Sequence, residues 1–398
     1  MKRLIKKIFE ILFCSLFYLF PIKKNKILFS SFYGRGYGDN LKYIAEALNR
    51  RTNKDTRFEM LWVISRNDEA SSLPDFIKPV CLNSIKYFYH IMTSAIWVDN
   101  CRKPIVFKKK KQFYIQTWHG GGAQKKAEGD VTEKLSKGYV KMAKKDSKHI
   151  DLFLSESHIM TQIYQRSYWY DGPIYECGYP RFDPIINCDN EIKRKVFDYF
   201  GLDYNLAIAL YAPTFRSNKS LGAYDVDFER FRTNLKKRFA KDFVVLIRLH
   251  PNVADKSVLI VSDNIFDATF YPDVQELLVA ADVLLGDYSS VNYDFCLKKS
   301  PVFRYAKDLN EYANDRDFYL KTEDYPFPIA MNNDELEELI LNYDQIQYEK
   351  KLTEFFDKIG AILEFGASNK VSNIIIDYCS IFNKKAFFEK NACKFIFK

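Results

Sequence analysis

Short apolar runs alternate with longer amphipathic stretches along most of this 398-residue chain, and no other feature restricts its fold as strongly. Short apolar runs bounded by turns are typical of buried strands, whereas the stretches between them, such as 41–50 and 274–281, have helical spacing. Strands that alternate with helices form parallel sheets covered on both faces. The predicted strands fall into two series, the first at 26–32, 58–65, 95–100, 112–118, 152–155 and 174–178, and the second at 206–213, 243–250, 265–270, 283–286 and 301–305.

Two such series predict an α/β protein with two doubly wound domains, each binding ligand near the carboxyl ends of its strands. A polar stretch at 187–195 separates the series and places the domain boundary near it. We therefore expect four parts, namely an amphipathic membrane-associating segment (1–25), a first Rossmann-like domain (26–190), a second Rossmann-like domain (191–375) and a C-terminal tail (376–398).

The N-terminal segment predicts an amphipathic helix that ends at Pro21. Its strongest apolar run, 11–20, is about half of the roughly 20 residues that span a bilayer, and no small-residue cleavage site follows it. Residues 1–26 carry seven Lys and Arg against the single Glu10. The segment fits an uncleaved helix lying in an anionic membrane surface. A helix docked on the protein's own core is the alternative.

The net charge of +9 is concentrated in two regions, with +6 in residues 1–26 and +10 in residues 101–149. Such regions favour anionic partners, here a membrane surface and an anionic substrate rather than nucleic acid. The eight cysteines contain no Cys-x-x-Cys pair, which argues against a disulfide scaffold or a zinc site. A P-loop and an acidic cluster suited to Mg²⁺ are also missing from the sequence. We expect neither a metal ion nor a cofactor.

One motif places a histidine and three glycines directly after a predicted strand. It reads Gln-Thr-Trp-His-Gly-Gly-Gly at 116–122. Glycines let a ligand approach the backbone closely, and their N–H groups can bind an anion. The pattern favours a catalytic His119 with the substrate held by Trp118, Gly120, Gly121 and Gly122, and a glycine-rich turn with a structural histidine is the alternative.

A second motif, Arg-Leu-His-Pro at 248–251, ends another predicted strand. Side chains alternate along a strand, so Arg248 and His250 share one face while Leu249 packs on the other. A guanidinium beside an imidazole suits phosphate oxygens. We expect His250 to be a second catalytic residue, with Arg248 and Leu249 binding the substrate, and an ordinary surface pair is the alternative.

Three further motifs follow strands in the same way. Residues 286–294 open a helix that Ser289 or Ser290 would cap, where free N–H groups favour an anion. Asp294 shares a helical face with Ser290. The motifs at 178–183 and 211–216 present Arg181, Pro213, Thr214 and Arg216.

Together and in this order, the five motifs resemble those of the CDP-glycerol glycerophosphotransferases, the teichoic acid primases and polymerases of bacterial envelopes. The resemblance runs from about residue 27 to 370. It implies a glycosyltransferase-B-like (GT-B-like) fold, with two Rossmann-like domains facing a cleft. It also implies transfer of glycerol phosphate from CDP-glycerol to a hydroxyl of a lipid-linked glycan or polymer acceptor, with release of CMP. Such an enzyme works at the cytoplasmic face of the cell membrane as a peripheral protein, in teichoic acid or capsule synthesis.

Carried over by position, the resemblance implies that His119 is the base for the acceptor hydroxyl and that His250 and Arg248 bind the pyrophosphate. It assigns the remaining donor contacts to Arg181, Pro213, Thr214, Ser289, Ser290 and Asp294. The family commonly has Thr-Pro after His-Gly, whereas this chain has Gly121-Gly122, which leaves open the acceptor and the choice between CDP-glycerol and CDP-ribitol. The alternatives are a nucleotide-sugar glycosyltransferase of the same fold and a non-enzymatic module that binds anionic polymer.

Overall fold

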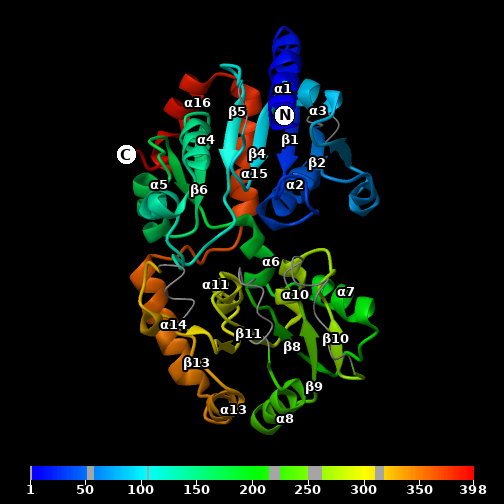
Figure 1. Ribbon diagram of the computed structural model, residues 1–398, viewed down its shortest axis with the longest axis vertical. Helices are drawn as coiled ribbons and strands as arrows, with labels where there is room; N and C mark the ends of the chain where they lie inside the picture. The colour runs from blue at the N-terminus through cyan, green and yellow to red at the C-terminus, as the bar shows by residue number, and fades with distance from the viewer. Residues whose placement is uncertain (1, 52–57, 105–106, 215–224, 250–261, 310–317) are drawn as a thin grey trace. The chain divides into compact units, whose positions relative to one another are not determined.

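The structure, a computed structural model, describes residues 2–51, 58–104, 107–214, 225–249, 262–309 and 318–398, without the side chains of residues 2–6 and 68 (Figure 1). The chain forms two compact units. The first comprises Met1–His119, Ala127–Asp183 and Glu364–Lys398, and the second comprises Gly120–Lys126 and Pro184–Leu363. Each unit contains one parallel sheet, as the alternation of apolar and amphipathic segments predicts.

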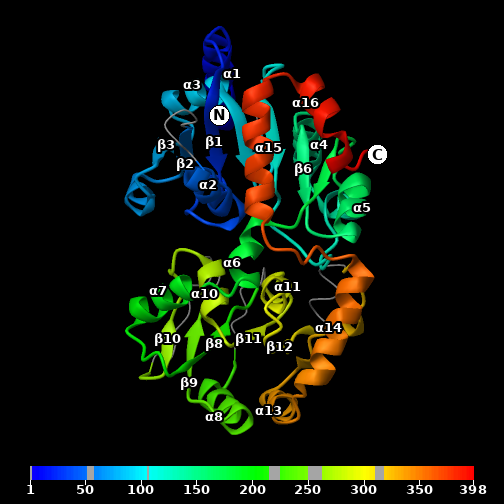
Figure 2. The same cartoon turned by 180° about the vertical axis from the view of Figure 1, so that it is seen from behind.

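The first unit contains a seven-stranded sheet in the order β3-β2-β1-β4-β5-β6-β7. Several of its strands are buried at every position because helices cover both faces, which explains their continuous apolar sequences. In Figure 1 helix α4 lies in front of this sheet, and in the reverse view of Figure 2 helix α15 does. The strands are β1 (Lys23–Ser30), β2 (Glu59–Ile64), β3 (Ile77–Cys81), β4 (Ser94–Asp99), β5 (Phe113–Gln116), β6 (Leu152–Ser155) and β7 (Ile174–Glu176), and the α-helices are α1 (Lys2–Tyr18), α2 (Asp39–Arg51), α3 (Ile85–Thr93), α4 (Lys137–Ser147), α5 (His158–Ser167), α15 (Ala367–Ile381) and α16 (Lys384–Asn391).

The second unit contains a six-stranded sheet in the order β10-β9-β8-β11-β12-β13. In both sheets the strand order reverses next to the first strand of the unit, between β1 and β4 and between β8 and β11. Ligands bind at such switch points in open α/β sheets. The strands are β8 (Ala207–Tyr211), β9 (Phe243–Ile247), β10 (Ile265–Asp267), β11 (Val283–Gly286), β12 (Val302–Tyr305) and β13 (Ile329–Ala330), and the α-helices are α6 (Asp183–Ile186), α7 (Asn190–Phe200), α8 (Phe228–Phe239), α10 (Val274–Ala280), α11 (Val291–Cys296), α13 (Asn333–Leu341) and α14 (Gln345–Ile359).

All eleven predicted strands are present, and two strands, β3 and β13, were not predicted. β3 is an edge strand that contains Pro79, and proline lacks the N–H that a central strand needs. Its alternation of buried and exposed residues is too short and irregular to stand out in the sequence. β13 has only two residues and is held by its neighbour β12.

The end of the chain belongs to the first unit, which corrects the prediction of a tail at 376–398 and of a second domain that reaches 375. The ring of Phe113 on β5 stacks on Tyr378 at 4.4 Å, and Phe387 of α16 is fully buried. The polar stretch at 187–195, near which the boundary was predicted, is mostly helical, because Asp189 caps α7. The central segment of the first unit ends at Asp183, before the predicted domain boundary at residue 190.

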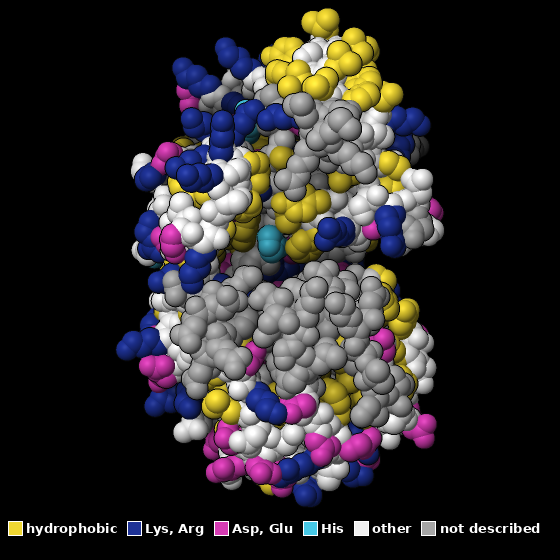
Figure 3. Space-filling model, in the orientation of Figure 1, with side chains coloured by type: hydrophobic (Ala, Val, Ile, Leu, Met, Phe, Trp, Pro, Cys, Tyr) yellow, Lys and Arg dark blue, Asp and Glu magenta, His cyan; other side chains and the backbone are white. Residues whose placement is uncertain are grey.

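Helix α1 is docked on the rest of the first unit along one side, as the alternative interpretation of the N-terminal segment predicts, and it exposes apolar residues on the other. The ring of Phe13 stacks on Phe88 of α3 at 6.0 Å, and Cys14 is fully buried, so one side of the helix docks on the first unit. On its other side Leu12 and Leu16 are 59% and 53% exposed, and Leu19, directly after the helix, is 85% exposed. Figure 3 shows apolar side chains gathered over α1. No helix in the described part of the chain is long and apolar enough to cross a bilayer.

Candidate active site

His119 lies two residues beyond the end of β5, at the carboxyl edge of the first sheet. Its ring stacks on Trp118 at 4.8 Å and meets the edge of Phe32 at 5.3 Å. Trp118 has a φ of +55°, a left-handed conformation that is costly for a bulky residue. Strain of this kind is concentrated at functional sites, where the surrounding structure maintains it.

The Nδ1 atom of His119 lies 2.5 Å from the carbonyl oxygen of Asn100. A carbonyl only accepts, so Nδ1 carries the proton and the lone pair of the neutral ring is on Nε2. The Sγ atom of Cys101 is the other polar neighbour of Nδ1, at 3.8 Å, and burial raises the pKa of this thiol to about 12, so it stays uncharged. In the described part of the chain, Nε2 makes no hydrogen bond, which leaves it available to accept a proton from a substrate.

Burial lowers the pKa of His119 below its usual value of 6.5. The carbonyl of Asn100 and the carboxylate of Asp39 act in the opposite direction, and Arg181 acts with burial. The ring is therefore neutral at pH 7 and can act as a general base without first losing a proton.

Trp118 is supported on its other side by a buried arginine. The guanidinium of Arg102 lies 5.6 Å from the Trp118 ring and pairs with Glu128 at 2.9 Å and Asp146 at 3.4 Å. The adjacent Lys103 pairs with Asp99 at 2.9 Å, and it too is buried. Two cations of the basic region 101–149 are thus internal, so this region offers less surface charge than its sequence suggests.

Arg181 lies in the first unit and is 2% exposed. Its guanidinium donates to Asp39 at 3.1 Å, and its backbone N–H donates to Asn40 at 3.2 Å. Asn40 in turn donates to the carbonyl of Trp118 at 3.2 Å. The structure therefore places the predicted donor ligand Arg181 in the network that surrounds His119, on the same unit.

Residues Gly120–Lys126 pack on the second unit. Gly122 has a φ of +69°, and a Cβ atom there would lie 2.7 Å from the ring of Tyr293. The Tyr325 hydroxyl donates to the carbonyl of Ala123 at 3.2 Å. At Gly122 the group that approaches the backbone is an aromatic ring of the protein, not the ligand that the sequence suggested, while Gly120 is half-buried and Gly121 buried.

At the carboxyl edge of the second sheet, the end of β8 is joined to the end of β11. Thr214 donates its backbone N–H and its hydroxyl to the carboxylate of Asp287, at 2.8 and 2.6 Å, and the preceding Pro213 is buried. Asn292 donates to the backbone carbonyl of Asp287 at 2.9 Å. This connection crosses the switch point between β8 and β11. The sequence motif at 286–294 contains Asp287 but predicts no role for it, because a carboxylate does not match an anionic ligand.

Arg248 follows β9 at the same edge. Its guanidinium donates to the carbonyls of Tyr271 at 2.5 Å and Ala268 at 3.3 Å, and burial lowers its pKa. No carboxylate of the described residues forms an ion pair with it, so its charge can meet an anion. Leu249 is 3% exposed and packs inward, as the alternation predicts.

The helix after β11, α11, is short, and of the two serines predicted to cap its start, Ser289 makes the bond. The Ser290 side chain makes no capping bond, whereas the Ser289 hydroxyl accepts from the N–H of Val291 at 3.3 Å. Asp294 is buried and accepts from Gln275 at 2.9 Å, which makes it a packing residue of the second unit. The predicted site residues Arg216 and His250 lie outside the described residues.

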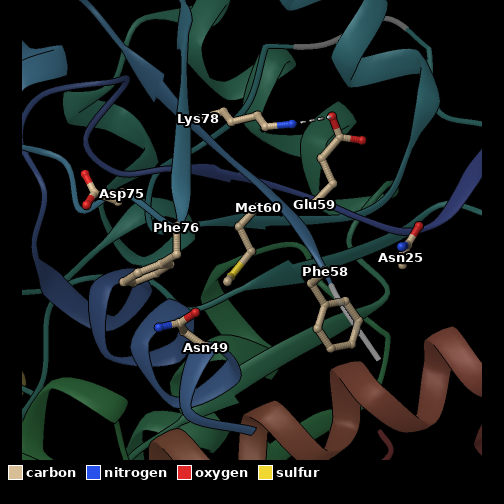
Figure 4. Close-up of a pocket in the computed structure, with 8 residues that line it drawn as sticks. All are labelled: Asn25, Asn49, Phe58, Glu59, Met60, Asp75, Phe76 and Lys78. Atoms are coloured by element: carbon tan, nitrogen blue, oxygen red, sulfur yellow. Dashed lines mark ion pairs between the residues drawn. The ribbon is translucent and has the colours of Figure 1, made fainter. Parts of the chain in front are cut away.

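A pocket of about 570 Å³ lies elsewhere, at the amino ends of β1, β2 and β3. Figure 4 shows its lining, in which Lys78 pairs with Glu59 at 3.8 Å. None of the predicted site residues lines this pocket.

Each of the two α/β units has a parallel sheet with polar residues gathered at its carboxyl edge. This combination defines a GT-B-like transferase architecture. The model of the CDP-Glycerol:Poly(glycerophosphate) glycerophosphotransferase family matches residues 12–377, so the chain belongs to this family.

Among relatives of known activity, the teichoic acid poly(glycerol phosphate) polymerase of Staphylococcus epidermidis is 30% identical over 373 residues, which cover 89% of this chain and 51% of that protein. The teichoic acid poly(ribitol-phosphate) polymerase of Bacillus spizizenii is 27% identical over 378 residues, which cover 90% of this chain and 57% of that protein. The chain thus spans little more than half the length of these two relatives. A solved structure of the wall teichoic acid polymerase TagF, a histidine variant soaked with CDPG, superposes with a TM-score of 0.81 at 29% identity and covers 93% of both chains.

Proposed function

We propose that this protein transfers a polyol phosphate, most simply glycerol phosphate from CDP-glycerol, to a hydroxyl of a lipid-linked glycan or polymer acceptor and releases CMP. The observation that carries the proposal is the state of His119. Its Nδ1 donates to the Asn100 carbonyl, and its neutral Nε2, at the edge of a Rossmann-like sheet, makes no hydrogen bond with the residues that the structure describes. Membership of the glycerophosphotransferase family supports the choice of reaction.

In the proposed reaction, Nε2 of His119 takes the proton of the acceptor hydroxyl. The acceptor oxygen attacks the β-phosphorus of the donor and forms a new P–O bond, while the bond from that phosphorus to the bridging oxygen breaks in line and CMP leaves with the electron pair. Arg248 and the hydroxyl of Ser290 are assigned to the diphosphate, whose negative charge grows on the leaving group. His250 has the same assignment from the sequence.

The identity of the polyol rests on the relatives, which include a glycerol-phosphate and a ribitol-phosphate polymerase at similar identity. We take CDP-glycerol as the donor for two reasons. The relative with the higher identity is a poly(glycerol phosphate) polymerase, and the superposed TagF structure comes from a soak with CDPG. CDP-ribitol is the second candidate. No metal ion takes part in the proposal, and turnover in excess EDTA tests that point.

The proposal also includes peripheral attachment to the cytoplasmic face of the cell membrane through α1. Ile8, Leu12 and Leu16 recur along the side of α1 that faces away from the protein, Leu19 follows directly after the helix, and each of the four is more than half exposed. Burying such an exposed apolar side stabilises a helix in the interfacial layer of a bilayer, and nearby lysines add attraction to anionic lipids. Attachment there would keep the enzyme beside a lipid-linked acceptor.

The experiment is a donor comparison with purified protein and a lipid-linked acceptor. We expect CMP release with CDP-glycerol and a product heavier by one or more glycerol phosphate units in mass spectrometry, and His119→Gln should form both at least about a hundredfold more slowly. The exposed His158 provides the matched control, His158→Gln, which should retain wild-type turnover. Faster turnover with CDP-ribitol would change the polyol, whereas sugar transfer from a UDP-sugar without CMP release would replace the proposal by glycosyl transfer.

A further inference from the structure

Asn100 holds the His119 ring through its backbone carbonyl, and the side chain of the same residue is fixed from three directions. Its Nδ2 donates to Asp39 at 2.5 Å and to Ser31 at 3.4 Å, and its Oδ1 accepts from the N–H of Phe32 at 2.8 Å. Asn100 is completely buried. These bonds cross the switch point between β1 and β4, so the position of the Asn100 carbonyl depends on the first unit's tertiary structure.

Asp39 is the charged member of this arrangement. It is the first residue of α2, has a φ of +58° and is 8% exposed. Its Oδ2 accepts from Asn100, and its Oδ1 accepts from Arg181 at 3.1 Å and from the N–H of Asn40 at 2.8 Å. Both carboxylate oxygens are therefore used, in two different directions. A buried carboxylate is tolerated here because Arg181 and the amino end of α2 both stabilise its charge.

We infer that Asp39 is a positioning residue for the general base: it holds Asn100, whose carbonyl keeps the His119 ring in the tautomer that leaves Nε2 free. The inference rests on the proposed function insofar as His119 is the base. It also assigns Arg181 as the counter-ion of Asp39, which differs from the donor contact that the family resemblance implies.

A purely structural ion pair between α2 and the turn that carries Arg181 would explain two of the contacts. It would not explain why the second carboxylate oxygen is directed to the residue that fixes His119. Arg181 and Asn100 donate to different oxygens of Asp39, and Asp39→Asn replaces one of these oxygens by an NH2 donor, so the variant keeps an acceptor in only one of the two directions. Asn is also one of the residues that tolerate a positive φ, so the backbone of the variant is not strained further.

The experiment combines NMR of protein labelled with ¹⁵N-histidine and steady-state kinetics. The resonances of His119 are assigned by their loss in His119→Gln. In the wild type we expect the Nδ1–H tautomer, and in Asp39→Asn a mixture that includes the Nε2–H form. In the same variant kcat should fall about tenfold or more, because small displacements of reacting groups are costly, while KM for CDP-glycerol stays within about twofold.

A second variant separates positioning from the ion pair. Asn100→Ser removes the side chain that Asp39 holds but keeps the Asn100 carbonyl and the pair of Asp39 with Arg181, and it should change tautomer and kcat in the same way. Ser84→Ala is the control for a lost helix cap, since Ser84 caps α3 away from His119, and it should change neither. If both site variants fold and keep the Nδ1–H tautomer, or change it with no loss of kcat, the inference is overturned. If His119→Gln retains full turnover, the proposed base is wrong, and the tautomer measurement still decides what Asp39 does to the ring.

Discussion

The carboxylate of Asp183 accepts the backbone N–H of Ser368 at 2.8 Å, although the two residues lie 185 positions apart. It also accepts from the N–H groups of Gly366 and Ala367 and from the Ser368 hydroxyl. Asp183 thus supplies the acceptors that the first turn of α15 lacks, and Gly366 has no side chain to do so. Asp183 is the last residue of the central segment of the first unit. It thereby fixes α15, the helix with which the C-terminal part of the chain rejoins this unit.

Asp183→Ala should therefore destabilise the first unit. Loss of a cap costs about 1 kcal/mol, and each buried donor left unsatisfied adds about 1–3 kcal/mol, so we expect a total of about 2–4 kcal/mol in urea unfolding. Asp189→Ala is the control, because Asp189 caps the more exposed helix α7 and should cost about 1 kcal/mol. Equal effects of the two variants would contradict the role assigned to Asp183.

Replacing His119 tests the base directly. His119→Gln should lower kcat by about 10²- to 10⁴-fold with donor binding preserved, because general-base catalysis contributes a factor of this size. Burial lowers the pKa of His119, and the base acts when neutral, so the acid limb of the wild-type kcat profile should fall below pH 6.5. A variant that keeps more than about a tenth of wild-type kcat, or an acid limb above pH 6.5 in the wild type, would argue against this assignment.

Arg248→Ala and Ser290→Ala test the donor site. A charged hydrogen bond contributes about 1.5–3 kcal/mol, so Arg248→Ala should raise the dissociation constant for CDP-glycerol by about tenfold to a hundredfold. Ser290→Ala should raise it by about twofold to tenfold, and the Ser290 side chain makes no capping bond whose loss would affect the fold. Unchanged CDP-glycerol binding in both variants, measured by calorimetry, would contradict the placement of the diphosphate at this edge of the sheet.

Charged substitutions on the exposed side of α1 test whether this side attaches the protein to a membrane. The double variant Leu12→Glu and Leu16→Glu should stay folded and lose co-sedimentation with vesicles that contain phosphatidylglycerol. Point substitutions are preferable to deleting residues 1–20, because deletion would uncover Phe88 and Tyr89, which pack against α1. Ile346→Glu, at a residue of the second unit that is 84% exposed, is the control. Undiminished vesicle binding by the double variant would assign attachment to another surface.

The stability of the first unit should fall on mild acidification because of His90. Burial and the nearby Lys26 lower the pKa of His90 to about 4, and its buried Nδ1 has no hydrogen-bond partner among the described residues. The unfolded chain therefore binds this proton at a higher pH than the folded protein, and stability is lost as the pH falls from about 6.5 towards 4. His90→Gln should show a smaller drop in melting temperature between pH 7 and pH 5, while His158→Gln should match the wild type. An identical drop in all three proteins would exclude His90 as the cause.

The amino-acid sequence alone determined the α/β class, the two parallel sheets and the positions of eleven strands. Burial on both faces of a parallel sheet requires continuous apolar runs, and these can be read locally. The motifs at the strand ends could be recognised as well, because polar residues and glycines interrupt the apolar runs there. The local pattern of residue types was therefore enough to place His119, Thr214 and Arg248 at sheet edges.

Only the tertiary structure decided what surrounds these residues. Asp39 and Asn100 are 61 positions apart, and nothing near either one in the chain indicates that they meet. The ring of Tyr293 explains why residue 122 is a glycine, since it leaves no room for a side chain there. The C-terminal segment joins the first unit because Asp183 caps α15. Such contacts depend on how helices and strands pack after the chain has folded, and the spacing of residue types in a sequence does not record them.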